Sequence, residues 1–121
     1  MVYSLHMSPL RIIEQTMTMD ELFRLAHERF GDLVKVVVDV KRGIMAIGGE
    51  LHADGEAMLL EHGSSQSDLW GINIYPDKTR SEWIEFDSMI NIRPAQGNRS
   101  RTVEDPGLQT KILEIVNRMI V

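Results

Sequence analysis

The chain has 121 residues and a formal net charge of −5 at pH 7, with 43% hydrophobic and 26% charged residues. This length and composition fit one ordinary globular domain and exclude a disordered chain. Cysteine is absent, which excludes disulfides, thiolate metal sites and a cysteine nucleophile. The acidic balance argues against nucleic acid as a partner. No apolar run reaches membrane length and residues 1–9 are too polar for a secretory signal, so we expect a cytoplasmic protein with no membrane partner.

The first confident element is a helix from Thr18 to Phe30. Thr18 and Glu21 have the spacing of a capping box, and Gly31 follows the helix where a terminating glycine is common. Residues 1–16 carry little signal, and we expect them to form a loosely placed N-terminal arm.

A β-hairpin is predicted next. Apolar residues dominate 33–40 and 44–47, and the intervening Lys41, Arg42 and Gly43 suit a short turn. If the strands keep a regular alternation, Val37, Met45 and Ile47 lie on the sheet face opposite Val36 and Val38. We therefore expect a homodimer that buries part of this apolar face.

The second half of the chain repeats this outline. Asp54 is a good N-cap for a helix through His62, and Asp105 with Pro106 begins a helix that runs to the C-terminus. Between these helices we expect strands over 69–75 and 82–93, followed by a polar loop over 95–104. The predicted order is α-β-β-α-β-β-α. It describes a single α+β domain, 1–121, with a four-stranded, mainly antiparallel sheet made from two hairpins.

Three segments together resemble a known family. They are GIMAIGGELHAD, SSQSDLWG and FDSMINIRPAQGNRS, which contain the shorter patterns GGELHAD, DLWG and INIRP. The sequence resembles a bacterial family of small uncharacterised proteins over the stretch from about Gly31 to the C-terminal helix. The resemblance implies a small standalone bacterial protein and supplies no activity, ligand or catalytic residue.

A first polar cluster consists of Glu50, His52 and Asp54. In an extended segment these side chains point the same way, about 6–7 Å apart. They are candidate metal ligands, with His62 or Asp87 completing the set, and Glu50 and His52 are candidate catalytic acid–base groups. A structural turn, with Asp54 capping the following helix, explains the same residues.

A second polar cluster consists of Asn91, Arg93, Asn98 and Arg99, with Gln96 and Asp87 nearby. Guanidinium groups bind carboxylate and phosphate through a planar fork of donors, which makes these residues candidate anion ligands. The structural alternative is an ion pair of Arg93 with Asp87 or Glu85 and a turn at Asn98. If the two clusters meet at one sheet edge, Glu50, His52, Arg93 and Arg99 share a cleft.

Two functions follow as hypotheses. The leading one is a non-enzymatic binding or interaction domain that recognises a small anionic ligand or a protein partner, with no cofactor. The alternative is a small hydrolase, with or without a metal, that uses the turn of Glu50, His52 and Asp54. Of the two tryptophans, Trp83 shares its predicted strand face with carboxylates and is the candidate exposed aromatic, whereas Trp70 is predicted to be buried.

Overall fold

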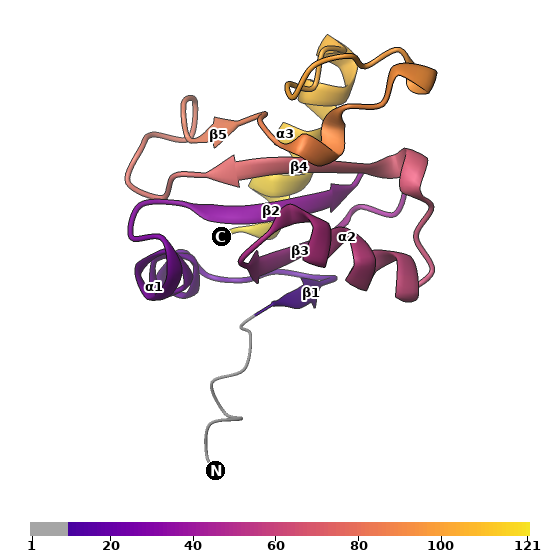
Figure 1. Ribbon diagram of the computed structural model, residues 1–121. Helices are drawn as coiled ribbons and strands as arrows, with labels where there is room; N and C mark the ends of the chain where they lie inside the picture. The colour runs from indigo at the N-terminus through magenta and orange to yellow at the C-terminus, as the bar shows by residue number, and fades with distance from the viewer. Residues whose placement is uncertain (1–9) are drawn as a thin grey trace.

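A computed structural model describes residues 10–121, and in this part the chain is α+β overall (Figure 1). An antiparallel sheet has the strand order β1-β3-β2-β4-β5. The strands are β1 (Arg11–Ile13), β2 (Val34–Asp39), β3 (Ile44–Gly49), β4 (Leu69–Ile74) and β5 (Ile84–Glu85). The α-helices are α1 (Met19–Arg29), α2 (His52–Glu61) and α3 (Pro106–Met119). Short 3-10 turns are η2 (Gln66–Asp68), η3 (Met89–Asn91) and η4 (Pro94–Gln96).

Helix α1 begins as its sequence indicates. The Thr18 side chain accepts a hydrogen bond from the backbone amide of Glu21, and the Glu21 carboxylate accepts one from the backbone amide of Thr18. These reciprocal bonds form the predicted capping box and satisfy two amides that lack partners within the helix. The Arg11 guanidinium, 2.9 Å from the same carboxylate, is the main cause that holds the pKa of Glu21 at about 2.

The register of the central strands assigns each side chain to a face of the sheet. Val36 lies opposite Ile47, and Val38 lies opposite Met45. Directly paired residues project to the same side, so Met45 and Ile47 share the face of Val36 and Val38. The predicted placement of Met45 and Ile47 on the sheet face opposite Val36 and Val38 is therefore wrong. The alternation of side chains along one strand does not carry across the hairpin turn, because the length of the turn sets the register of the next strand.

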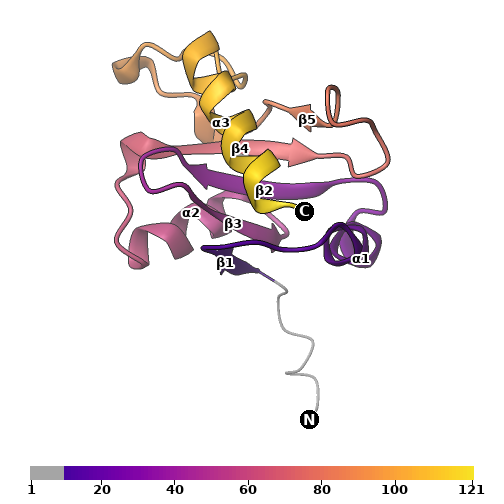
Figure 2. The same cartoon turned by 180° about the vertical axis from the view of Figure 1, so that it is seen from behind.

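Helix α3 crosses the first face, α1 lies at the end of the sheet where β2 begins, and both pack into the larger core (Figure 2). Leu22 and Ala26 of α1 and Ile112 and Val116 of α3 are buried there. Trp83 belongs to this core with 1% of its surface exposed, so the prediction of an exposed aromatic at this position is wrong.

Helix α2 covers part of the second face, around Val37, Ala46 and Leu59. The helix approaches closely because its inward residue is glycine. A Cβ at Gly55 would lie 3.0 Å from a methyl group of Val37. Strand residue Lys35 lies on this same face beyond the N-terminal end of α2, where the apolar packing gives way to polar groups.

The predicted four-stranded sheet is wrong, because the sheet has five strands. Residues 11–13 of the predicted arm pair with β3 as β1, while residues 1–9 lie outside the described part of the chain. The predicted strand over 82–93 is reduced to Ile84–Glu85. Beyond it the chain bends because the Asn91 side chain, rather than a strand backbone, pairs with Gly71.

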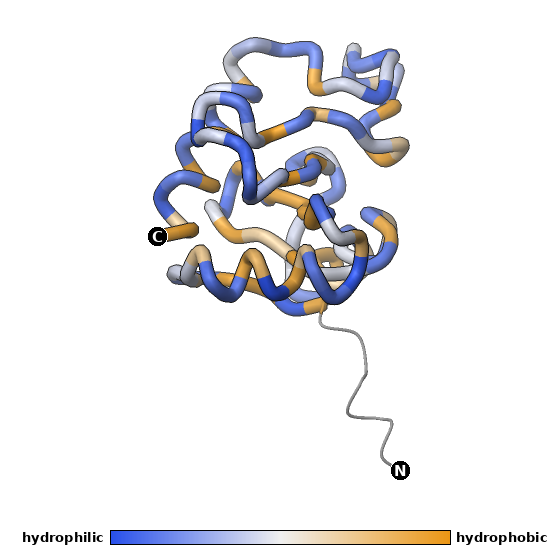
Figure 3. Tube along the Cα trace, turned by 90° about the vertical axis from the view of Figure 1, so that its left-hand side faces the viewer, coloured by the Kyte–Doolittle hydropathy of each residue, from blue (hydrophilic) through white to orange (hydrophobic). Residues whose placement is uncertain are grey.

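Hydrophobic and hydrophilic residues alternate along the helical turns, which is the pattern of helices with one buried side (Figure 3). Among residues 10–121, no helix has the length and apolar character needed to cross a membrane.

Candidate functional site

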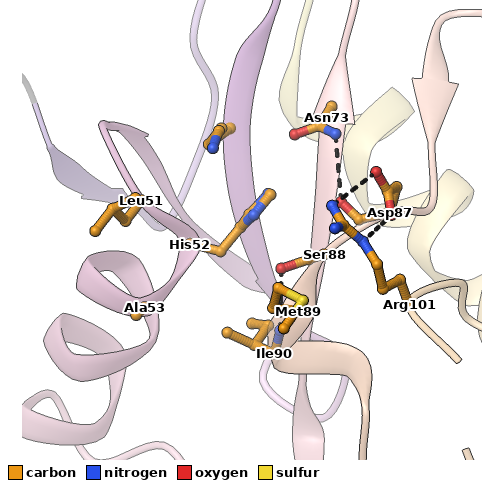
Figure 4. Close-up of a pocket in the computed structure, with 10 residues that line it drawn as sticks. Leu51, His52, Ala53, Asn73, Asp87, Ser88, Met89, Ile90 and Arg101 are labelled. Atoms are coloured by element: carbon orange, nitrogen blue, oxygen red, sulfur yellow. Dashed lines mark hydrogen bonds and ion pairs between the residues drawn. The ribbon is translucent and has the colours of Figure 1, made fainter. Parts of the chain in front are cut away.

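A cavity of about 210 Å³ opens on the second face of the sheet, between the start of α2 and the segment that follows β5 (Figure 4). We call it the α2 pocket. It is smaller than the roughly 300–1,000 Å³ of typical small-molecule sites, so it suits a small ligand or one end of a longer one. Its lining residues are Lys35, Leu51, His52, Ala53, Asn73, Asp87, Ser88, Met89, Ile90 and Arg101.

Helix α2 begins at this pocket without a side-chain cap. Leu51 occupies the N-cap position, and an apolar side chain accepts no hydrogen bond from the first amides. The predicted cap, Asp54, lies inside the helix, where its backbone amide donates to the Leu51 carbonyl at 3.1 Å. The first-turn amides of His52 and Ala53 therefore give the pocket wall a partial positive charge.

His52 is the first residue of α2 and is 9% exposed. Its Nε2 lies 2.7 Å from the backbone oxygen of Ile72. A carbonyl oxygen only accepts, so Nε2 carries the proton and Nδ1 is an acceptor in the neutral ring. Burial is the main cause that lowers the pKa of His52 below its ordinary value, and the neutral form dominates at pH 7.

Asn73 is 6% exposed, and only the nitrogen of its side-chain carboxamide is hydrogen-bonded. Its Nδ2 donates to Glu85 Oε1 at 2.9 Å and to the backbone oxygen of Asp87 at 3.3 Å. Its Oδ1 is buried and has no hydrogen-bond partner among the described residues. Leaving such an acceptor unpaired costs about 1–3 kcal/mol, so an unpaired one at a pocket indicates a missing donor. Figure 4 shows this oxygen on the His52 side, turned away from Asp87.

Two cations stand at the pocket rim. Lys35 makes no ion pair within residues 10–121, and its Nζ lies 5.2 Å from the ring centroid of Phe30. Arg101 binds Asp87 through two bonds, from Nε at 2.7 Å and from Nη2 at 3.1 Å. One negative and two positive side chains leave the rim with an excess of one positive charge.

The other wall of the pocket is apolar. Leu51 is 56% exposed and Met89 is 64% exposed, both large fractions for hydrophobic side chains. Ile90 and Ala53 continue this wall toward the sheet. The pocket thus combines hydrogen-bonding groups on its floor with hydrophobic groups at its mouth.

The structure separates the members of the first predicted cluster. Glu50 pairs with Arg29 at 3.1 Å, His52 enters the α2 pocket, and Asp54 is exposed. Within residues 10–121, no three histidine, aspartate or glutamate side chains gather where they could hold a metal ion. Only His52 of this cluster lines the pocket.

The second predicted cluster holds the chain in place. The Asn91 carboxamide pairs with both backbone groups of Gly71, at 2.8 and 2.9 Å, as a neighbouring strand would. Asn98 donates to the backbone oxygens of Asn91 and Thr102. Both side chains are buried, and their hydrogen bonds stabilise the fold of the 88–104 segment.

Arg93 fastens the start of β4. Its guanidinium donates to the backbone oxygens of Gln66 and Leu69 and lies over the Trp70 ring, 4.0 Å from the centroid. Arg99 is exposed, and its backbone amide donates to Glu104. Gln96 likewise donates to a backbone oxygen, that of Ser67.

The predicted shared cleft of the two clusters is wrong. Glu50 follows Gly49, which pairs with Lys35 near the start of β2. Arg93 binds Leu69, which pairs with Asp39 at the end of β2. The two charges therefore lie at opposite ends of the strands. The error came from the fourth strand, which the chain does not form over 86–93.

Most pocket residues escaped the sequence analysis. Asn73 had a usable signal, since it is the one amide in the apolar run LWGINI and lies opposite Lys35 in the sheet. Asp87 was predicted only as a neighbour of the two polar clusters, and Arg101 had no signal, because the two residues are 14 positions apart and only the folded segment joins them.

The fold and site define an α+β domain with a small pocket on one face of its sheet. The N-terminus of helix α2 forms part of the pocket wall. The chain belongs to the protein family of unknown function DUF5674, which matches residues 11–119. This confirms the resemblance to a family of uncharacterised proteins; its bacterial origin stays a prediction. No curated protein and no solved structure matches the chain.

Proposed function

We propose that the protein is a binding domain for a small amphipathic ligand that carries an anionic group, and that the α2 pocket is its site. The observation that carries the proposal is the unpaired Oδ1 of Asn73, buried at a pocket that also receives an uncapped helix N-terminus. A pocket with unpaired polar groups on both sides is suited to a ligand that supplies their hydrogen-bond partners.

The charges support an anion as one end of the ligand. The N-terminus of α2 favours negative charge, and Lys35 adds a cation that makes no ion pair with a carboxylate within the described residues. Asp54, in the first turn of α2, is exposed and does not line the pocket.

The apolar wall supports a hydrocarbon part as the other end. Leu51 and Met89 expose surface that a ligand would remove from water, at about 25 cal/mol for each Å² of apolar area. Methionine adapts to irregular shapes, so Met89 suits a ligand-facing position.

A titration with 4-methylpentanoate, followed by the backbone amide signals of the ¹⁵N-labelled protein, tests this proposal. We expect saturable shifts at His52 and Ala53 with millimolar affinity, and weaker binding in Lys35→Gln. Arg24→Gln is the matched control, because it removes the same charge from an exposed position on α1 outside the pocket. Shifts that scatter over the surface, or that do not saturate, contradict the proposal.

His52 favours hydrolysis as a second candidate function. Its Nε2 is fixed by the Ile72 carbonyl, which leaves Nδ1 free to accept a proton. Glu50 and Asp54 are not beside it in the pocket. Release of nitrophenol from p-nitrophenyl acetate would be expected to vanish in His52→Gln and to persist in His27→Gln. Equal rates in both variants contradict a catalytic His52.

A further inference from the structure

The polar groups of the α2 pocket demand more of a ligand than a negative charge. The uncapped amides of α2 and Lys35 are donors, whereas Asn73 Oδ1 and His52 Nδ1 are acceptors. A simple carboxylate satisfies the donors and leaves the Asn73 oxygen unpaired. A complete ligand therefore carries an N–H or O–H donor close to its anionic group.

Resting on the proposed function, we infer that the pocket takes an N-acylated α-amino acid with an apolar side chain, the chemistry of a peptide's C-terminal residue. Its carboxylate would face the start of α2, its amide N–H would donate to Asn73 Oδ1, and its side chain would lie against Leu51 and Met89. One residue of this kind places an anion, a donor and an apolar group around a single carbon atom. The small cavity, open at its apolar mouth, matches one residue with the chain continuing outward.

The charges at the pocket rim favour a ligand whose amino group is acylated over one whose amino group is free. A free α-amino group is a cation at pH 7, and in this pocket it would lie near Lys35 and Arg101. A neutral amide N–H makes the same hydrogen bond without that repulsion. The acylated form is therefore favoured over the free amino acid.

Access to Asn73 requires one side chain to move. Water does not reach its Oδ1, and Lys35 lies directly opposite Asn73 across the β2–β4 pair. Side chains paired on one sheet face lie within reach of each other, so we assign the shielding of this oxygen to the Lys35 stem. Lysine is flexible, and its ammonium gains an anionic partner when it swings toward a carboxylate.

The experiment compares four ligands on the full-length protein by calorimetry or amide shifts. N-acetyl-L-leucine has all three features, 4-methylpentanoate lacks the N–H donor, N-acetyl-L-leucine amide lacks the carboxylate, and free L-leucine replaces the amide by an ammonium. We expect N-acetyl-L-leucine to bind about tenfold more tightly than 4-methylpentanoate, the worth of one neutral hydrogen bond. The amide and free leucine are expected to bind more weakly than N-acetyl-L-leucine.

The outcomes separate this inference from the proposed function. Equal affinity for N-acetyl-L-leucine and 4-methylpentanoate overturns the inference and leaves the anion pocket standing. No binding of either at His52 and Ala53 overturns both. A tetrapeptide ending in leucine distinguishes the sources: tighter binding than N-acetyl-L-leucine indicates a peptide, and equal binding indicates a free acylated amino acid.

A variant tests the role assigned to Asn73. In Asn73→Ala we expect the tenfold ratio between the affinities for N-acetyl-L-leucine and 4-methylpentanoate to fall to about one. A preference that survives in the folded variant overturns the assignment. If this variant does not fold, the comparison of ligands on the wild-type protein still decides the inference.

Discussion

Single buried polar side chains control both the pocket and the segment that forms its wall. His52 and Asn73 lie on the floor, while Asn91 fixes the chain that carries Ser88, Met89 and Arg101. Buried polar groups are expensive to leave unpaired, so each has a measurable effect when it is changed.

We predict that stability depends on pH through His52. Burial lowers its pKa in the folded protein below the ordinary value near 6.5. As the pH falls below about 6.5, the unfolded chain takes up the proton first, so the free energy of unfolding decreases until the folded-state pKa is passed. Urea unfolding at several pH values measures this slope. It should be smaller in His52→Gln than in the wild-type protein.

Asn91→Ala should reduce the free energy of unfolding by about 1–3 kcal/mol, because it leaves both backbone groups of Gly71 without their partners. Gln15→Ala, at an exposed position, is expected to change stability by less than about 0.5 kcal/mol. Urea denaturation compares the two. Similar small effects would mean that water replaces the Asn91 carboxamide.

At the scale of elements, the segment after β5 defines the pocket because it leaves the sheet early. It crosses close over β4 at Gly71, where an added Cβ would lie 2.6 Å from Ser88 Cβ. The Ser88 hydroxyl then accepts a bond from the Ile90 amide at 3.2 Å and begins η3. Gly71 in β4 and Ser88 packed against it thus determine how closely the segment that forms the pocket wall approaches the sheet.

Gly71→Ala should therefore cost about 1–3 kcal/mol through overpacking and should displace Ser88 and Met89. The second substitution in Gly71→Ala/Ser88→Gly removes the clashing Cβ and should restore part of the stability. Thermal unfolding of the single and double variants measures this coupling. Additive losses would show that the close approach is not the source of the strain.

At the scale of the whole molecule, the sheet joins two cores. The larger one holds both tryptophans, and the smaller one, under α2, holds Leu59. Strands β2, β3 and β4 each contribute side chains to both cores. We therefore expect disruption of the packing on one face to weaken the packing on the other. The homodimer stays a prediction, and its remaining support is the exposure of Leu51 and Met89.

Leu59→Ala should cost about 2–5 kcal/mol and shift the unfolding seen by tryptophan fluorescence as much as that seen by circular dichroism. The fluorescent groups lie on the other face, so coincident shifts demonstrate a single cooperative unit. Leu60→Ala is the matched control, since Leu60 is 41% exposed on the same helix. A fluorescence transition that stays in place would show that the two faces unfold separately.

The sequence by itself determined the elements that local patterns control. The capping box at Thr18, the hairpin of β2 and β3, and the Asp105 cap of α3 were all readable, because capping and turn chemistry involve neighbours in the chain. Only the tertiary structure decided β1, the early end of β5 and the pocket. These depend on contacts between distant residues, such as Asn91 with Gly71 and Arg101 with Asp87, and no local pattern encodes which distant partner a polar side chain will meet.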